Sequence, residues 1–332
     1  MPPADALTFA GRVLHDAQPA TGGYSGETFA GMWLRRRAYV RLYLRDPARA
    51  QVDLALMRRL EGALPLAAVL SAMTAPPTSA AGLPAHLVTA AVPGRRGDTL
   101  LDAAASVPAA RALGRSAARV VNALRAQRFD VPGPLLDAGL RVGRWPAALG
   151  SLTRFAAHLG PGLTAAGFDV SRRSPLHGAL VAADGRLAGG VPQPPSLVHG
   201  DLNAKNLVVH PDTGQLQAVL DWEHAHSGSW LTDVGNLLRG LDRPGATPSA
   251  LAFRQGLVDS MHEILLADRL TNPAAPTPPD WVASAADHDL FAVLDLAARP
   301  VTGPVPPPVS VAREVLRELP RLLPRPALDL PR

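Results

Sequence analysis

The chain has 332 residues, of which 47% are hydrophobic and 18% are charged, so it contains enough apolar side chains for a sizeable folded core. It contains no cysteine, which excludes disulfides, thiolate metal sites and a cysteine nucleophile, and which fits a reducing cytosol. The sequence begins without the basic and apolar segments of an export signal, and no stretch is apolar enough for a membrane span. We therefore expect a cytoplasmic protein with no membrane partner.

The net charge of +5 comes from scattered arginines without interleaved aromatic residues, which argues against a nucleic-acid partner. Residues 1–200 carry 22 basic and 12 acidic side chains, whereas the rest of the chain carries 11 basic and 16 acidic ones. An acidic second part suits a cationic substrate, and a basic first part suits phosphate groups. Lys205 is the only lysine of the chain. Nothing in the sequence indicates the oligomeric state.

The first 90 residues show a mixture of helical and strand patterns. Helical spacing of apolar residues predicts a helix over 4–17, and two apolar stretches at 29–34 and 38–44 predict a β-hairpin. A helix is predicted to start at Asp46 and Pro47, a good N-terminal pair, and to run to Gly62. Residues 71–82 are rich in Ala, Pro, Ser and Thr and predict a loop, and a strand follows at 86–91.

The pattern changes near Pro93 from strands to long helices, so we place a domain boundary there. The predicted helices cover about 108–128, 146–167, 232–240, 248–270, 280–299 and 309–323, and an irregular passage rich in proline and glycine covers 172–195. Between these helices, short strands are predicted at 197–199, 207–210 and 216–220.

The segment LVHGDLNAKNLVV, residues 197–209, contains an apolar strand, a polar loop and a second apolar strand. This order places His199, Asp201 and Asn206 at one end of a small sheet. Fifteen residues after Asn206, the strand in AVLDWE delivers Asp221 to the same sheet. Phosphoryl transfer requires a carboxylate that orients the attacking hydroxyl and oxygen ligands for Mg²⁺. Asp201, Asn206 and Asp221 supply that set.

The motifs in these segments resemble those of a known family. HGDLNAKN, residues 199–206, matches the HxDxxxxN catalytic loop, and VLDWE, residues 219–223, matches the metal-binding aspartate segment, of the aminoglycoside phosphotransferase and choline kinase-like family. The resemblance implies that Asp201 is the catalytic base, that Asn206 and Asp221 bind Mg²⁺, and that His199 supports the loop. It also implies that Asp233, in LTDVGNLL, braces the loop. Singly, each aspartate could be a helix cap and the histidine a core residue; the ordered set is what is specific.

The same resemblance implies an α+β, bilobal, protein kinase-like fold. Residues 1–92 are expected to form a nucleotide-binding lobe with a small antiparallel sheet, and residues 93–332 a mainly helical lobe for catalysis and substrate binding. ATP and Mg²⁺ are expected between the lobes, with adenine against the backbone of 86–92. A small molecule with a hydroxyl group is the expected acceptor.

In the nucleotide-binding lobe, the resemblance predicts a glycine-rich turn over the phosphates, and GGYSGETF supplies Gly22, Gly23 and Ser25. This segment is not GxGxxG, and adjacent glycines also suit a plain bend. Kinase-like folds usually have a lysine in the following strand, where this chain has Arg41, with Asp53 as its expected partner on the next helix. An arginine at the surface of an edge strand is the alternative interpretation of Arg41.

Two other functions fit parts of the sequence. A metal-dependent hydrolase is suggested by a dense group of candidate ligands, namely His199, Asp201, His210, Asp221, Glu223, His224 and His226. A non-catalytic kinase-like binding module is suggested by the missing lysine and the irregular glycine segment. The hydrolase explains neither the opening order of strand, strand and helix nor Asn206, and the binding module does not explain why Asp201, Asn206 and Asp221 are all present.

The acceptor is left open between two groups of compounds. Aminoglycoside-like or other cationic antibiotics suit the acidic second part of the chain, and choline, amino-alcohol or sugar metabolites suit the same catalytic residues. The helices after Asp233 are expected to line the acceptor pocket. The candidate acidic contacts are Glu223, Asp259, Glu263, Asp287 and Asp289.

Overall fold

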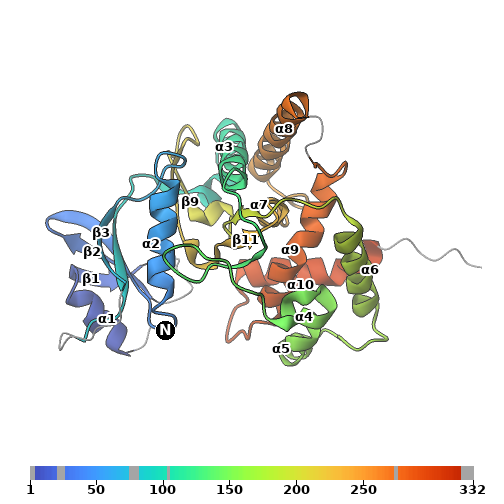
Figure 1. The fold of residues 1–332 in the computed structure, drawn as a ribbon, viewed down its shortest axis with the longest axis horizontal. Coiled ribbons are helices and arrows are strands. Elements are labelled where there is room, and N and C mark those ends of the chain that lie inside the picture. Colours follow the sequence, from blue (N-terminus) through green and yellow to red (C-terminus); the bar gives the residue numbers. More distant parts are fainter. Residues whose placement is uncertain (1–3, 21–26, 75–81, 103–104, 273–275, 323–332) are drawn as a thin grey trace, which may run out of the picture.

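The computed structural model describes residues 4–20, 27–74, 82–102, 105–272 and 276–322. An antiparallel sheet with two helices lies at one end of the molecule, and a mainly helical part follows it along the chain (Figure 1). Short strands and the two long helices α3 and α8 lie between these ends (Figure 1). The α+β class expected from the sequence is therefore confirmed.

The first sheet has five strands in the order β1-β2-β3-β5-β4, and all neighbouring strands are antiparallel. Its strands are β1 (His15–Pro19), β2 (Thr28–Trp33), β3 (Arg36–Leu42), β4 (Val69–Met73) and β5 (His86–Ala90), and the helices of this part are α1 (Ala4–Gly11) and α2 (Arg49–Leu60). The predicted hairpin, the helix after it and the strand at 86–91 are thus present. The hairpin turns through Leu34 and Arg35, both at positive φ (43° and 67°), as a two-residue turn between twisted strands requires.

Two predictions for this part are wrong in their extent. The helix predicted over 4–17 ends at Gly11, because the following residues form the edge strand β1, whose Pro19 lies opposite Phe29 of β2. The loop predicted over 71–82 begins inside β4, which pairs with β5. In both places pairing to a neighbouring strand, which a local pattern does not record, determines the structure.

The three short strands around the catalytic loop belong to two sheets and not to one. One sheet has the order β10-β9-β6, with β6 (Arg95–Arg96), β9 (Leu207–Val209) and β10 (Leu216–Val219). The other has the order β7-β11-β8, with β7 (Gly133–Pro134), β8 (Ser196–Val198) and β11 (His226–Gly228). The prediction of one shared sheet is therefore wrong, because β8 finds its partner in β11, beyond Asp221. The catalytic loop connects the two sheets.

The C-terminal part contains most of the helices. They are α3 (Val107–Arg125), α4 (Leu152–His158), α5 (Gly160–Ala165), α6 (Pro175–Gly189), α7 (Leu231–Leu238), α8 (Pro248–Thr271), α9 (Trp281–Ala298) and α10 (Pro307–Glu318), with 3₁₀ turns η1 (Gly97–Leu101), η2 (Ala147–Gly150), η3 (Ala204–Asn206), η4 (Trp222–His224) and η5 (Leu319–Leu322).

Two helical predictions for this part need correction. The helix predicted over 146–167 is divided into η2, α4 and α5, and Pro161 stands in the first turn of α5, where its missing N–H costs nothing. The passage 172–195, predicted to be irregular, contains α6. Ser174 caps this helix, since its hydroxyl accepts a hydrogen bond from the His177 N–H at 3.0 Å, and Pro175 follows as its first residue. This start signal was present in the sequence but was outweighed by the glycines and prolines around it.

The apolar core is divided among clusters that follow the architecture. The largest joins α2, α3, α7 and α8 with the strands around the catalytic loop, and a second joins α4, α5, α6, α9 and α10. Helices α3 and α8 approach each other closely at Gly114 and Gly256. A Cβ on Gly114 would lie 2.1 Å from the Phe253 carbonyl oxygen, and one on Gly256 would lie 2.2 Å from that of Arg111. The absence of side chains at these two glycines therefore allows α3 and α8 to pack closely together. Both helices belong to the core cluster that also contains the strands around the catalytic loop.

Candidate active site

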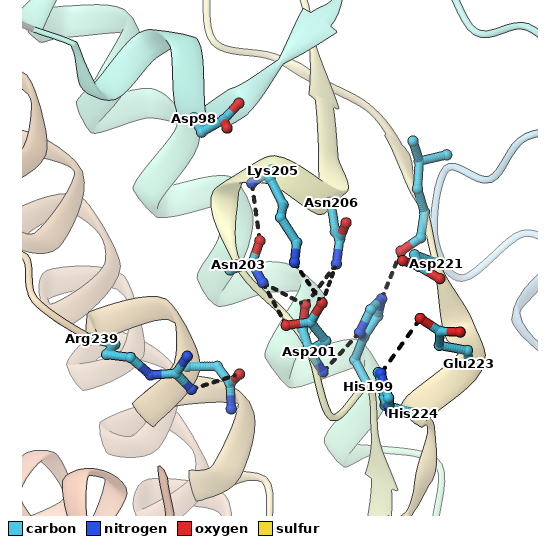
Figure 2. A network of polar contacts seen from close by, with 12 residues as sticks. Asp98, His199, Asp201, Asn203, Lys205, Asn206, Asp221, Glu223, His224 and Arg239 are labelled. Carbon is cyan, nitrogen blue, oxygen red and sulfur yellow. Dashed lines mark hydrogen bonds and ion pairs between the residues drawn. The ribbon is translucent and has the colours of Figure 1, made fainter. Parts of the chain in front are cut away.

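Figure 2 shows the side chains expected to carry the chemistry near one another, and these side chains line one cavity. The loop between β8 and β9 carries Asp201 and Asn206, and Asp221 lies two residues after the end of β10. The backbone joins these segments, since the Leu220 N–H donates to the Asn206 carbonyl at 2.9 Å. Asp201, Asn206 and Asp221 all line the same cavity. The expected convergence of two carboxylates and an amide is therefore present, although it does not arise from a single sheet.

Asp233, near the start of α7, holds the backbone of the catalytic loop. Its side chain is buried, and its two oxygens accept hydrogen bonds from the N–H groups of His199 at 2.8 Å and Gly200 at 2.9 Å. Burial raises the pKa of Asp233, while His199 and the two N–H donors oppose that shift. The carboxylate satisfies two donors at the turn into the loop, which fixes the position of Asp201.

His199 and Gly200 bring the catalytic loop against the segment after β10. The His199 Nε2 lies 2.8 Å from the Leu220 carbonyl oxygen and therefore donates to it, and Nδ1 accepts a long hydrogen bond of 3.4 Å from the Asp201 N–H. The imidazole packs on the ring of Trp222 with centroids 4.7 Å apart. Gly200 has φ +81°, and a Cβ there would lie 2.4 Å from the His224 carbonyl oxygen. Only glycine fits this backbone and this close approach.

The Asp201 carboxylate is held by three side chains of its own loop (Figure 2). Its Oδ1 accepts from the Asn203 amide at 2.8 Å, and its Oδ2 accepts from the Asn206 amide at 3.1 Å. The ammonium group of Lys205 lies 2.9 Å from Oδ2. Asn206 also donates to the Asp201 carbonyl at 2.8 Å, so its amide nitrogen faces Asp201 and its amide oxygen is the atom available to a cation.

Arg41, on β3, bridges the two acidic residues that follow β10. One guanidinium nitrogen bonds Asp221 and the other bonds Glu223. Burial acts to lower the pKa of Arg41, but the two carboxylates outweigh it and the pKa is raised. Glu223 has its pKa lowered to about 2, because His224 and Arg41 outweigh the opposing effect of burial. Arg41, which stands where related folds usually have lysine, thus contacts Asp221, one of the two expected Mg²⁺ ligands.

The backbone of Asp221 turns sharply as the chain leaves β10. Its φ of +65° and ψ of +70° place it in the left-handed region, which is uncommon for a residue with a side chain. The segment after it, η4, carries Glu223 and His224. Backbone strain of this kind persists where surrounding contacts hold it, as at a functional site.

A comparison with protein families identifies the group to which the sequence belongs. The model of the phosphotransferase enzyme family (APH) matches residues 16–257, a range that contains all the side chains described above. The chain belongs to the phosphotransferase enzyme family. The resemblance inferred from its two motifs is therefore confirmed.

Solved structures of aminoglycoside phosphotransferases share the fold of this family member. A thermostable mutant of aminoglycoside phosphotransferase APH(4)-Ia, in a ternary complex with ADP and hygromycin B, superimposes with a TM-score of 0.60 and 17% identity over 96% of this chain and 98% of that one. The GDP complex of wild-type aminoglycoside 2′-phosphotransferase-IIIa gives a TM-score of 0.57 and 13% identity over 93% of each chain. The bilobal, protein kinase-like fold is thereby confirmed.

One curated protein matches a short segment. The mouse protein "Acyl-CoA dehydrogenase family member 10" is 37% identical over 59 residues, which are 18% of this chain and 6% of that protein. This chain therefore corresponds to a small part of its length.

The predicted pair between Arg41 and Asp53 is not formed in this phosphotransferase family member. Asp53 instead accepts hydrogen bonds from Arg49 Nε at 2.6 Å and from the Tyr43 hydroxyl at 2.7 Å. Arg49 stands four residues before Asp53 on the same helix and reaches it directly, while Arg41 is held by the acidic residues after β10. Arg49 also donates to the Ala225 carbonyl at 3.2 Å, which links α2 to η4.

Several contacts of the site could not be predicted from the sequence or were not predicted. The spacing of Arg49 and Asp53 was a usable signal, whereas the contacts of Tyr43, Glu223 and Lys205 depend on the folded structure. The predicted phosphate turn, with Gly22, Gly23 and Ser25, lies outside the described residues.

The cavity has a volume of about 470 Å³ and extends from the catalytic loop to α9. Within the described ranges, no three His, Asp or Glu side chains are grouped to hold a metal ion, so the ligand cluster of a metal-dependent hydrolase is not formed there. His210, one of its candidate ligands, is exposed. No helix in the described part of the chain is long and apolar enough to cross a bilayer.

Proposed function

We propose that this protein transfers the γ-phosphate of ATP to a hydroxyl group of a small molecule, with Mg²⁺ as cofactor. The observation that supports this function best is the convergence of Asp201, Asn206 and Asp221 on one cavity in a member of the phosphotransferase family. The ADP and GDP complexes of the two solved relatives also support a nucleotide site in this fold.

Asp201 is the proposed base. Its carboxylate lines the cavity and accepts hydrogen bonds from Asn203 and Asn206, which hold it in one orientation. The acceptor hydroxyl donates to this carboxylate and is thereby aimed at the γ-phosphorus. A bond forms between the acceptor oxygen and the γ-phosphorus while the bond from phosphorus to the β,γ-bridging oxygen breaks. Its electron pair leaves with ADP, and the hydroxyl proton passes to Asp201.

Asn206 and Asp221 are the proposed Mg²⁺ ligands. An amide oxygen and a carboxylate are hard oxygen donors, which Mg²⁺ prefers. This ion is usually held by one or two protein carboxylates together with phosphates and water, so a site with two protein ligands suits it better than a cluster of three or more. When bound, Mg²⁺ neutralises charge on the phosphate oxygens.

Arg41 is the proposed cation for the phosphates, in place of the usual lysine. Its guanidinium is pinned by Asp221 and Glu223, and its Nε has no hydrogen-bond partner among the described residues although it is buried. If the Asp221 carboxylate turns toward a metal ion, Arg41 retains Glu223 and presents N–H groups to phosphate oxygens as a planar fork. Asp53 then acts indirectly, by holding Arg49 and α2.

The test is Mg-ATP-dependent ADP release across aminoglycosides, macrolides, peptide antibiotics and amino alcohols. We expect Asp201→Asn to reduce turnover by about 10²–10⁴-fold, because the base is lost, while ATP binding is retained. Asp212→Asn is the matched control, since Asp212 is an exposed aspartate in the turn between β9 and β10. Equal turnover in the Asp201→Asn variant and the wild type would overturn the proposal. Absence of both Mg-ATP binding and turnover would favour the non-catalytic binding module.

A further inference from the structure

Part of the cavity lining is apolar and aromatic. This part is formed by Trp145, Leu149, Phe155, Phe291 and Leu296. Trp145 precedes η2, Leu149 lies in η2, Phe155 lies in α4, and the last two residues lie in α9. The rings of Phe155 and Phe291 pack 5.8 Å apart, and Trp145 packs edge-on against His226 at 5.2 Å. Trp145 is 40% exposed, which is high for a tryptophan that lines a cavity. We call these five residues the aromatic wall.

The carboxylates that line the cavity already have cationic partners. Asp201 is paired with Lys205, and Asp221 and Glu223 are both paired with Arg41. The fourth lining carboxylate, Asp295, lies 2.7 Å from Arg299. A ligand ammonium group would therefore meet carboxylates whose charge is already partly balanced by a cation of the protein.

Positive charges also line this cavity. Lys205, Arg239 and Arg299 are among the lining residues, and Arg239 is fixed from behind by Asp289 and by Asn236 at 3.1 Å. Burial lowers the pKa of His226 to about 4, so this lining side chain offers hydrogen bonds without a positive charge. Lys205 and Arg299 are the ion-pair partners already named, so the described lining carries four carboxylates against three cationic side chains, and Arg41 is bound to two of those carboxylates. This nearly balanced charge gives a ligand with several ammonium groups no strong attraction.

Of the five acids expected to attract a cationic acceptor, only Glu223 lines the cavity. Asp259 pairs with Arg111 at 2.9 Å, and Asp287 pairs with Arg186 at 2.7 Å. Neither acid lines the cavity, and the exposed Glu263 does not line it either. Most of the acids expected to attract a cationic acceptor therefore lie outside the cavity lining.

We propose that the acceptor is an alcohol with an apolar or aromatic body and at most one positive charge. Its hydroxyl lies at Asp201, and its body packs against the aromatic wall. This proposal rests on the proposed phosphotransferase function. It differs from the cationic-antibiotic expectation, because the charge of the cavity itself, and not that of the chain, determines what binds there.

The experiment measures binding and turnover separately on the full chain. Dissociation constants are determined by calorimetry for chloramphenicol and erythromycin, which have apolar bodies and at most one charge. They are also determined for hygromycin B, which is polycationic, and for choline, which has one charge and no large apolar body. We expect the first two compounds to bind at least about tenfold more tightly than the last two. Trp145→Ala should weaken their binding by about tenfold, because an aromatic anchor is lost. Leu266→Ala is the control, since Leu266 is 60% exposed on α8 and does not line the cavity.

The outcomes distinguish the two proposals. Tightest binding by hygromycin B or choline would overturn the acceptor proposal, and so would failure of both apolar compounds to bind. Unchanged binding in both Trp145→Ala and Phe291→Ala would overturn it as well. Turnover of hygromycin B that depends on Asp201 would leave the kinase function standing while removing the acceptor class. Binding of the apolar compounds without any Asp201-dependent phosphate transfer would instead remove the kinase function.

Discussion

Asp233→Asn tests whether the carboxylate under the catalytic loop positions Asp201. The two carboxylate oxygens accept from the N–H groups of His199 and Gly200 at 2.8 and 2.9 Å, in a site from which water is excluded. Asparagine has the same shape but only one acceptor, so one N–H faces an NH₂ group and loses its partner. The loss of one such bond costs about 1–3 kcal/mol of unfolding free energy. Because the affected backbone leads directly into Asp201, we expect kcat to fall by at least about tenfold.

The assay combines urea unfolding, which gives the free energy of unfolding, with ADP release from Mg-ATP. Asp242→Asn is a suitable control, since Asp242 is an exposed acid shortly after α7. A decrease in kcat larger than any change in the ATP Kd would identify a positioning role. If the Asp233→Asn variant retained both wild-type stability and wild-type kcat, the brace would be refuted.

Three further predictions concern the pairs and packing around the site. The folded pKa of Glu223 is about 2 against an ordinary value of 4.5, so its stabilising contribution is complete above about pH 4.5 and is lost as the pH falls through 2. Glu223→Gln should cost on the order of 2 kcal/mol by urea unfolding at pH 7 and about a quarter of that at pH 2.5. An equal loss at both pH values would contradict this. Lys205→Met removes the cation 2.9 Å from Asp201 and should lower kcat by about tenfold, while the free energy of unfolding changes by less than about 1 kcal/mol. Lys205→Arg should retain more activity. Wild-type kcat in the methionine variant would exclude a catalytic effect of this cation. Gly114→Ala should lower the free energy of unfolding by about 1–3 kcal/mol, because its Cβ would lie 2.1 Å from the Phe253 carbonyl oxygen. Gly178→Ala is the control, since Gly178 has open space around it on α6, and this change should raise the melting temperature. An unchanged stability in the Gly114→Ala variant would contradict the close approach of α3 and α8.

The presence of Arg41 where related folds usually have lysine has a structural consequence. A guanidinium has separate donors on its two terminal nitrogens, so Arg41 binds Asp221 and Glu223 at the same time. An ammonium group would concentrate its charge at one point. In this chain the predicted nucleotide-binding cation is therefore also the group that connects β3 to the segment after β10.

The sequence by itself indicated the residues of the proposed catalytic set, and it predicted the class of the fold. Asp201, Asn206 and Asp221 were recognisable because their order and spacing lie within short apolar segments, and local patterns predicted the hairpin, α2 and most of the long helices. Local patterns failed where a distant partner decided the outcome, as for β1, which forms an edge strand next to β2.

Only the tertiary structure decided which charges meet. Arg41 and Asp221 are 180 residues apart in the chain, and no local pattern indicates that they pair in preference to Arg41 and Asp53. The aromatic wall likewise combines side chains from segments far apart in the sequence. The spacing of the proposed catalytic residues is local, so it can be recognised in the sequence. The charge and shape of the acceptor cavity depend on side chains from distant segments, so they can be seen only in the folded chain.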